Sequence, residues 1–355
     1  MQKFKRIGVL TSGGDAPGMN AAVRSVVLSA LAKGVEVVGI YKGYTGLISG
    51  EVKTLTAADV NGRIDDSGTL LYSDRCPEFK TEEGMAKAVD TCKKLGIDGI
   101  VAIGGDGTFR GATDLSIRGI PTIGIPGTID NDITSTDYSI GFDTAMNTTM
   151  RMIDNLRDTC ESHARCDVIE AMGRNAGWIA LQCGIATGAV AIAIGEVEFD
   201  ADAAIERIKK LRAQGQRSFI VVVSETFGAE FSEGFAKRIE AETGVETKFA
   251  RFAHIVRGGS PTLRDRLTAT KMGKYAVDLL LDGKSDLVVC EKSGQIVPTE
   301  IKFALIVDRM FKNKLKDGDL DKFTSDEIEL MKQICAQKQA SFDDMMNTAI
   351  LLAQN

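Results

Sequence analysis

The sequence predicts an α/β protein in which the strands of a parallel sheet alternate with helices. Short apolar runs are repeatedly followed by a glycine-bearing turn and then by apolar residues at helical spacing. The chain has 37 glycines, only six prolines and an apolar content of 44%, which is typical of packed domains with many strand–helix turns. At 355 residues it exceeds one ordinary core, so two domains are expected.

Composition also narrows the class of protein. No apolar run approaches the roughly 20 residues needed to span a bilayer, and the start MQKFKRIGVL leads directly into a strand, so we expect a soluble protein with no membrane partner. The seven cysteines show no metal-ligand spacing, which indicates reduced thiols and a cytoplasmic location. The formal net charge of −6 argues against nucleic acid as a partner. An anionic ligand would therefore need a local cluster of Arg and Lys.

The chain opens with a β–loop–α–β pattern. Residues 6–10 predict a buried strand, TSGGDAPG at 11–18 forms the loop, and residues 19–33 and 35–40 predict a helix and a second strand. The three glycines of the loop fit a phosphate cradle, but they fit a plain strand–helix turn almost equally well. The residues alone leave both alternatives open.

Residues 41–79 have a weak pattern of short strands and turns. Within them Arg75 precedes Cys76-Pro77, and an X-Pro pair holds the chain extended in a way that suits presenting a guanidinium to phosphate. A solvated surface arginine is the simpler explanation. Further helices are expected at residues 81–95, 143–159, 178–186, near 202–214 and 232–242, at 261–281 and at 300–311, and further strands at 167–171, 190–194, 219–223 and 286–290.

The most informative stretch is residues 99–132, GIVAIGGDGTFRGATDLSIRGIPTIGIPGTIDND. Apolar runs at 100–103 and 122–125 end in the loops GGDG and PGTIDND, which should emerge at the carboxyl edge of one parallel sheet, where open sheets bind ligands. The glycines allow backbone N–H groups to close around a phosphate. Asp106 would repel a bare phosphate, so it predicts a divalent cation held between carboxylate and phosphate oxygens. We interpret the two loops as a metal–phosphate site, with a tight turn and a solvated acidic turn as the alternative explanations.

The second half repeats the pattern. MGRNAG at 172–177 is again a glycine-bearing turn between a strand and a helix, and Glu225 follows the strand at 219–223, where an exposed acid is common. HIVRGGS at 254–260 combines a histidine, an arginine and two glycines that could grip an anion, although a lone histidine is more often structural. In the charged tail, TSDE at 324–327 and SFDD at 341–344 each resemble a capped helix start, so two short amphipathic helices are expected.

Taken in order, the motifs LTSGGDAPGMNA, IGGDGT, PGTIDND, TDYSIGFDTA, MGR and HIVRGGSP resemble those of the 6-phosphofructokinase family, from Arg6 to about Phe311. The resemblance implies a glycolytic kinase that transfers the γ-phosphoryl group of ATP to the 1-hydroxyl of fructose 6-phosphate, with Mg²⁺ as cofactor. It implies two doubly wound parallel-sheet domains with the active site in the cleft between them, in a homo-oligomer, dimer or tetramer, whose active sites are completed by a neighbouring subunit. The implied domains are residues 1–141 plus 254–304 for the nucleotide, 142–253 plus 305–323 for the sugar phosphate, and 324–355 as a helical C-terminal extension.

The resemblance also assigns roles residue by residue. ATP would be bound by Gly14, Arg75, Cys76, Gly105, Asp106, Gly107 and Thr108, with Asp106 as the metal ligand. The catalytic residues would be Asp130 as general base, Asp132, which helps organise the metal, and Arg174, which neutralises charge on the transferred phosphoryl group. The sugar phosphate would be bound by Thr128, Ile129, Asp130, Arg165, Met172, Gly173, Arg174, Glu225, Lys248, His254 and Arg257, with Arg165 and Lys248 reaching in from a neighbouring subunit.

Two positions depart from the family pattern. Lys248 stands where the family has Arg, so a point charge replaces a planar fork, and Arg251 nearby could substitute. NAGW at 175–178 looks more like the pyrophosphate-using branch, but that branch has Asp in place of Gly107 and Lys in place of Gly127, so ATP is favoured. The alternatives are a pyrophosphate-dependent enzyme, a non-catalytic regulatory subunit of the same fold, and a nicotinamide nucleotide kinase, which would leave PGTIDND and HIVRGG unexplained.

The resemblance finally concerns regulation. Bacterial members of the family usually bind ADP or phosphoenolpyruvate at a second, largely basic site between subunits. On the first helix that site uses two arginines one turn apart; here Arg24 remains, but the second position is Leu28. The other altered positions are Ala57, Val190 and Gln216, while Arg157 remains with Arg217 as a possible neighbour. We therefore expect neither effector to act.

Overall fold

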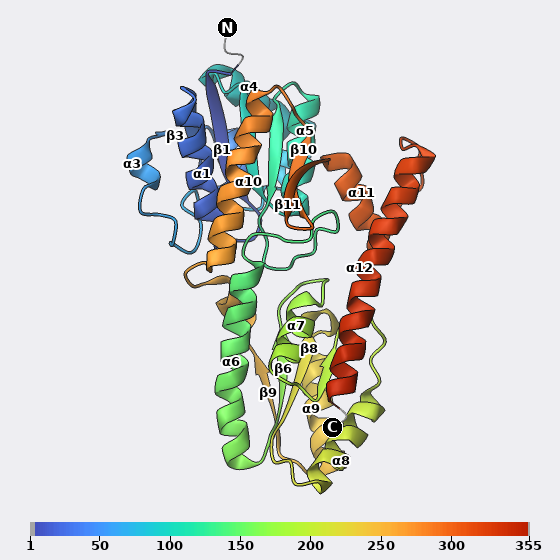
Figure 1. Ribbon diagram of the computed structural model, residues 1–355. Coiled ribbons are helices and arrows are strands. Elements are labelled where there is room, and N and C mark those ends of the chain that lie inside the picture. Colours follow the sequence, from blue (N-terminus) through green and yellow to red (C-terminus); the bar gives the residue numbers. More distant parts are fainter. Residues whose placement is uncertain (1–3, 354–355) are drawn as a thin grey trace. The chain divides into compact units, whose positions relative to one another are not determined.

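The computed structural model describes residues 4–353 and has the predicted α/β architecture with two separate sheets (Figure 1). Its contacts divide the chain into two compact units. Of the described residues, unit 1 contains 4–129, Ile133–Thr144 and Arg257–Cys335, and unit 2 contains Asp130–Asp132, Ala145–Val256 and 336–353. Both units are therefore interrupted in sequence. Among the described residues no helix combines the length and the apolar character needed to cross a bilayer.

Unit 1 is built on a seven-stranded sheet in the order β11-β10-β5-β4-β1-β2-β3. Its strands are β1 (Arg6–Ser12), β2 (Glu36–Ile40), β3 (Val52–Leu55), β4 (Gly99–Gly104), β5 (Thr122–Pro126), β10 (Leu287–Lys292) and β11 (Gln295–Glu300). The edge strands β3 and β11 are antiparallel to their neighbours, and the other pairs are parallel. The helices of unit 1 are α1 (Met19–Ala32), α2 (Tyr44–Ser49), α3 (Ala57–Val60), α4 (Glu82–Leu95), α5 (Asp106–Ile117), α10 (Leu263–Leu281) and α11 (Ile301–Phe311).

The central strands of this sheet are covered on both faces. α1 packs against α10 on one face, and α4, α5 and α11 lie on the other (Figure 1). Every residue of β4 is buried, which is why its sequence GIVAIG is apolar without alternation. The sheet thus holds the carboxyl ends of β1, β4 and β5 in fixed register.

The predicted domain boundaries differ from this division. Residues 305–323 were expected in the second domain but belong to unit 1. The reason is the packing of α11, whose Phe303, Ile306 and Val307 form an apolar cluster with Met331. In addition, the Asp308 carboxylate accepts a hydrogen bond from the backbone N–H of Thr134.

Unit 2 is built on a four-stranded parallel sheet in the order β7-β8-β6-β9. Its strands are β6 (Cys166–Ala171), β7 (Ala191–Ala193), β8 (Phe219–Ser224) and β9 (Thr247–Arg251), and its helices are α7 (Trp178–Ala186), α8 (Ala201–Ala213) and α9 (Ala229–Thr243). Helix α6 (Phe142–His163) begins in unit 1 and continues into unit 2. An apolar core between the sheet, α8 and α9 stabilises this unit.

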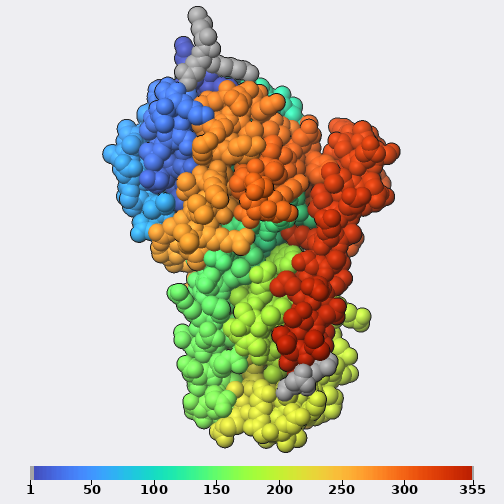
Figure 2. Space-filling view, viewed as in Figure 1, coloured from blue at the N-terminus to red at the C-terminus, as the bar shows by residue number. Residues whose placement is uncertain are grey.

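The tail forms one helix, α12 (Ser325–Leu352), where we expected two. The first predicted cap is confirmed, because Glu327 N–H donates to Thr324 Oγ1 at 3.3 Å and Thr324 N–H donates to the Glu327 carboxylate at 2.7 Å. The second predicted cap is wrong: Ser341 lies inside the helix, since no Gly or Pro interrupts it and the following Phe342 is buried. The last turns of α12, red in Figure 2, lie on the surface of unit 2.

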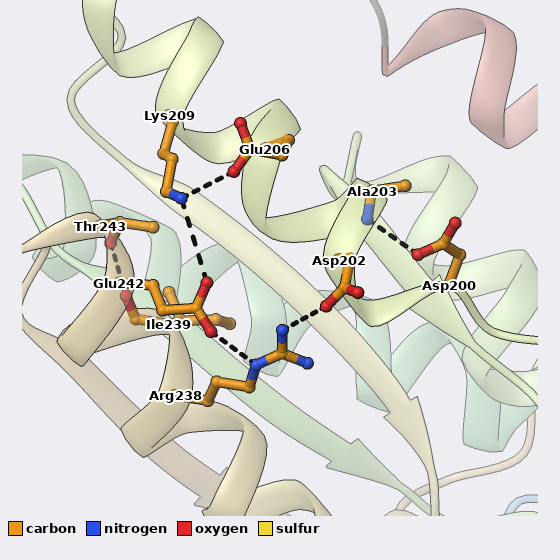
Figure 3. Close-up of polar contacts among 9 residues, drawn as sticks. All are labelled: Asp200, Asp202, Ala203, Glu206, Lys209, Arg238, Ile239, Glu242 and Thr243. Carbon is orange, nitrogen blue, oxygen red and sulfur yellow. Dashed lines mark hydrogen bonds and ion pairs between the residues drawn. The ribbon is translucent and has the colours of Figure 1, made fainter.

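Ion pairs join α8 and α9 on the surface of unit 2 (Figure 3). The Arg238 guanidinium contacts Asp202 of α8 and donates from Nε to Glu242 of its own helix at 2.7 Å. Lys209 lies 2.7 Å from Glu206 and 4.0 Å from Glu242. Each exposed pair of this kind adds only about 0–1 kcal/mol to the free energy of unfolding. The packing of α8 against α9 therefore depends mainly on the apolar core beneath these pairs.

Candidate active site

Two glycine loops lie side by side at the topological switch point of the large sheet. β1 is flanked by β2 on one side and by β4 on the other, and the chain continues from β1 into α1 and from β4 into α5, which cover opposite faces of the sheet. Ser12 pairs with Gly104 at the ends of these strands, and Thr108 Oγ1 donates to Ser12 O at 3.0 Å. A Cβ at Gly104 would lie 2.3 Å from Thr108 Oγ1 and 2.4 Å from Ser12 O. Glycine is therefore required at residue 104 by the fold itself.

The next two glycines are different. A Cβ at Gly105 or Gly107 would meet no atom within 4 Å, and neither residue has a positive φ. The folded chain therefore does not need glycine at these positions. Both lie at the N-terminus of α5, where backbone N–H groups are unpaired and the helix dipole favours an anion. The open space beside them is what a phosphate cradle requires.

Asp106 is the first residue of α5 and the candidate metal ligand. Its carboxylate forms an i,i+4 ion pair with Arg110 at 2.9 Å and is about one third exposed. The described residues contain no group of three or more His, Cys, Asp or Glu that could hold a metal ion. A single carboxylate beside a phosphate cradle nevertheless fits Mg²⁺, because this ion usually keeps waters and is bound by one or two carboxylates together with substrate phosphates.

The segment around Arg75 is attached to the first glycine loop. Gly13 N–H donates to Asp74 O at 3.4 Å, and Ser73 Oγ donates to Gly13 O at 2.5 Å. Arg75 itself is exposed, whereas Cys76 is half-buried and packs against the core of unit 1. The structure thus brings the segments that carry the predicted ATP-binding residues of unit 1 together at the carboxyl ends of β1 and β4, although Cys76 packs into the core.

Arg257 lies beside the same loop. A Cβ at Gly14 would be 3.8 Å from Arg257 Nη1, and the same nitrogen lies 3.9 Å from Asp15 Oδ1. His254, predicted to bind the same phosphate as Arg257, belongs to unit 2 and is exposed. Within unit 1, Arg257 therefore adds positive charge next to the glycine loops.

The PGTIDND loop continues from β5. Gly127 N–H donates to Gly104 O, and Thr128 N–H donates to Ile140 O, both at 3.0 Å. Ile129 is buried, and the exposed fractions of the next three residues, Asp130, Asn131 and Asp132, are 7%, 4% and 9%. Asn131 has a φ of +48°, so the backbone turns sharply between the two acids.

In unit 2 the MGR turn and Glu225 meet at the ends of neighbouring strands. The Glu225 carboxylate, just after β8, accepts hydrogen bonds from the backbone N–H groups of Gly173 and Arg174, which follow β6. Met172 is buried, and Thr226 Oγ1 donates to Arg174 O at 3.1 Å. Arg174 has a φ of +56°, a conformation that costs about 1–3 kcal/mol for a residue other than glycine and occurs at functional sites. Its guanidinium is exposed and makes no hydrogen bond or ion pair within the described residues.

A shared carboxylate brings Arg165 and Lys248 together. Arg165 Nε donates to Glu246 Oε2, and Lys248 Nζ contacts Glu246 Oε1, each at 2.8 Å. The hydrogen bonds from Arg165 and then Lys248 lower the pKa of Glu246 to about 2, so this acid is charged at neutral pH. The two predicted phosphate-binding cations therefore lie next to each other at the start of β6 and β9.

Arg251 does not take the place of Lys248. The two residues are three positions apart on β9, so their side chains leave opposite faces of the strand. Arg251 Nε forms an ion pair at 2.6 Å with Glu170, a buried acid on the neighbouring strand β6. The expectation that Arg251 could substitute for the family arginine is therefore wrong.

The family model for phosphofructokinase matches residues 6–280. The chain belongs to the phosphofructokinase family. It is 52% identical over 298 residues to the ATP-dependent 6-phosphofructokinases of Bacillus pumilus and Bacillus subtilis, and in both cases the match covers 84% of this chain and 93% of the relative. The solved phosphofructokinase of Saccharomyces cerevisiae matches 93% of this chain with a TM-score of 0.82 and 31% identity. This chain spans half the length of that yeast chain.

One buried acid outside the phosphofructokinase motifs holds a loop of the candidate site in place. Asp265 on α10 is fully buried and accepts hydrogen bonds from Tyr138 Oη, Gly141 N–H and both the N–H and the hydroxyl of Thr144. It thereby holds the end of the connection that follows PGTIDND. Sequence reasoning missed Asp265 and Glu246, and the one available signal was the Thr262 cap that places Asp265 in the first turn of α10.

Proposed function

We propose that this protein is an ATP-dependent 6-phosphofructokinase that converts fructose 6-phosphate and ATP into fructose 1,6-bisphosphate and ADP. The observation that carries the proposal is the identity of about one half, over 84% of the chain, to relatives named for this activity. The geometry supports it, because Asp106 starts the helix that follows β4, and Asp130, Asp132 and Arg174 lie on loops that leave the carboxyl ends of the parallel strands β5 and β6. We further propose a cytoplasmic homo-oligomer in which Arg165 and Lys248 serve a neighbouring subunit.

The nucleotide phosphates would lie against the glycine loops of unit 1. There, the backbone N–H groups at the start of α5, the exposed Arg75 and the nearby Arg257 offer positive potential, and the open positions at Gly105 and Gly107 leave room. Asp106 would hold Mg²⁺, which when bound neutralises charge on the phosphate oxygens. The acid's existing ion pair with Arg110 orients its carboxylate at the start of α5.

The chemistry would rest on Asp130 and Arg174. Asp130 would accept the proton of the 1-hydroxyl as that oxygen attacks the γ-phosphorus, and Asp132 would help organise the metal. The exposed guanidinium of Arg174 would stabilise the charge of the transferred phosphoryl group. Thr128, Met172 and Glu225 would hold the sugar. Positioning and charge stabilisation supply most of the rate in phosphoryl transfer, so no covalent intermediate is needed.

One assay tests the proposal. Purified protein with fructose 6-phosphate and magnesium is offered ATP or pyrophosphate in parallel, and bisphosphate formation is followed. We expect activity with ATP only, because the chain has Gly107 and Gly127 where the pyrophosphate branch has Asp and Lys, so no carboxylate opposes the nucleotide and no lysine takes its place. Activity with pyrophosphate would favour the runner-up enzyme, and activity with neither donor would favour a regulatory subunit.

The Gly107→Asp variant is expected to fold normally and to bind ATP at least roughly tenfold more weakly, because like charges brought together cost kilocalories per mole. Folding is preserved since a Cβ at this position meets no atom within 4 Å. The matched control is Gly107→Asn, which adds the same volume without charge. Titration calorimetry with ATP and magnesium measures the effect, and equal ATP affinities in Gly107→Asp and the wild type would place the nucleotide elsewhere.

ADP and phosphoenolpyruvate are expected to leave the fructose 6-phosphate saturation curve unchanged. Val190 is buried in the core of unit 2, and Leu28 stands where the family has the second arginine of the first helix, so these two positions lack the charge that the family effector site uses, while Arg24 and Arg157 remain. Each lost charge-assisted hydrogen bond to phosphate is worth roughly 1.5–3 kcal/mol. Half-saturation is measured with and without each effector. A shift that disappears in Arg24→Ala would show that the effector site still works.

A further inference from the structure

The C-terminal helix contacts the helix that follows the MGR turn. The ring of Phe342 on α12 stacks on the indole of Trp178, the first residue of α7, with 3.7 Å between ring centroids and an angle of 27° between planes. Phe342 is fully buried, and Trp178 is 7% exposed. Both residues belong to unit 2. α12 lies wholly outside residues 6–280, so the family match does not account for this contact.

Polar contacts run alongside the stacked rings. Gln339 of α12 donates from Nε2 to Glu196 O at 3.1 Å, and the Glu196 carboxylate accepts from Gly177 N–H at 2.8 Å. Lys338 Nζ lies 5.5 Å from the centroid of the Trp178 ring. Burial raises the pKa of Glu196, and its Oε2 makes no hydrogen bond within the described residues. The extension thus contacts Trp178, the first residue of α7, directly through the stacked rings, and it reaches Gly177, the residue before it, through Glu196.

Those residues end the turn that carries Arg174. At its start the turn is held by Glu225, and at its end by Gly177, where a Cβ would lie only 2.5 Å from Ile194 Cβ. The backbone of Arg174 between these two points has a positive φ. A strained conformation persists only where the surrounding structure over-determines it. Support at both ends is therefore a condition for the position of the Arg174 guanidinium.

The structure assigns to Phe342 the role of a positioning residue for phosphoryl transfer: by stacking on Trp178 it holds the turn that presents Arg174. The assignment rests on the proposed function, in which Arg174 stabilises the transferred phosphoryl group. It also explains why the chain has Trp in NAGW, since the aromatic side chain at residue 178 has its partner in the C-terminal extension. Phe342 acts through Trp178 and the turn.

Packing of α12 on unit 2 becomes looser after Phe342, although Met346 and Ala349 are still buried. Towards its end, Met346, Ala349 and Ile350 line a cavity of about 330 Å³ that is also bounded by β7 and the start of α8. Leu351 in the same last turn is 63% exposed. A large apolar residue of this helix can therefore be removed without touching the Trp178 contact, which supplies a matched control.

Trp178 is the single tryptophan of the sequence, so its fluorescence reports the contact directly. In Phe342→Ala we expect a red-shifted emission, stronger quenching by acrylamide, and a kcat lower by roughly 10- to 100-fold, the scale that a displacement of about 1 Å produces. The KM values for ATP and fructose 6-phosphate should change far less, because Arg174 acts mainly in the transition state. Phe342→Leu, which keeps apolar bulk, should restore most of kcat, and Leu351→Ala should match the wild type in every measurement.

A double-mutant cycle separates this role from a general loss of stability. If Phe342 acts through Arg174, Phe342→Ala should lower kcat much less in an Arg174→Ala background than in the wild type. An unchanged kcat per folded enzyme despite the red shift, or a full and additive loss in the Arg174→Ala background, would overturn the assignment. If Phe342→Ala does not fold, the same measurements on Phe342→Leu test the assignment. For that variant we expect a small red shift together with a correspondingly small fall in kcat. Wild-type protein inactive with ATP would instead overturn the proposed function itself.

Discussion

Replacing Asp130 by Asn is expected to lower kcat by roughly 10²- to 10⁴-fold, the usual contribution of a general base. The amide keeps the size of the side chain but cannot accept the proton of the sugar hydroxyl. The loss corresponds to about 3–5 kcal/mol of transition-state stabilisation, since each tenfold change in rate is about 1.4 kcal/mol. Fructose 6-phosphate affinity, measured by titration calorimetry, should stay close to that of the wild type, because the sugar and phosphate contacts of the other residues remain.

Asp137→Asn is the matched control for this variant. Asp137 lies on the same connection after β5, is exposed, and accepts a hydrogen bond from Ser293 N–H at 2.7 Å, which an amide oxygen can still accept. Its kcat should equal that of the wild type. Near-normal turnover in Asp130→Asn, or an equal loss in both variants, would contradict the assignment of Asp130 as the base.

The fold could be predicted where strands are buried on both faces. The apolar runs at 6–10, 100–103 and 122–125 became β1, β4 and β5, because a strand covered by helices on both sides must be apolar along its length. The strands that the sequence did not reveal, β9 and β11, and β3, which fell in a stretch where short strands were expected but could not be placed, all lie at the edge of a sheet. Edge strands are partly exposed and carry polar residues such as those of VKTL and QIVPTE, so their pattern is weak.

The candidate site could likewise be predicted only in part, because the loops are visible in the sequence and the side-chain contacts between distant residues are not. The glycine loops could be located because an apolar run ending in glycines implies the carboxyl edge of a parallel sheet. Two acids that hold other parts of the candidate site could not be located, since their partners are distant in sequence: Asp265 holds residues 138–144, and Glu246 joins Arg165 to Lys248. The Glu170–Arg251 pair was likewise invisible, because it depends on the register of β6 against β9.

The Asp265→Ala variant is expected to lose on the order of 3–5 kcal/mol of unfolding free energy, because each buried donor left without an acceptor costs about 1–3 kcal/mol. The carboxylate is fully buried and accepts from four donors, among them Gly141 N–H at 2.7 Å and Thr144 N–H at 2.9 Å. Burial raises its pKa, while these hydrogen bonds act in the opposite direction and favour the ionised form. The loss is a large share of the roughly 5–15 kcal/mol that stabilises a typical domain.

Urea unfolding followed by circular dichroism measures this effect as a lower midpoint at an unchanged slope. The control is Asp282→Ala, because Asp282 follows the end of the same helix α10 and is exposed. Its midpoint should equal that of the wild type. Since Asp265 holds the end of the connection that carries Asp130, Asp265→Ala should also lose activity at a temperature below its own unfolding transition. A variant with wild-type midpoint and wild-type activity would show that the four donors find other acceptors and that Asp265 does not organise this connection.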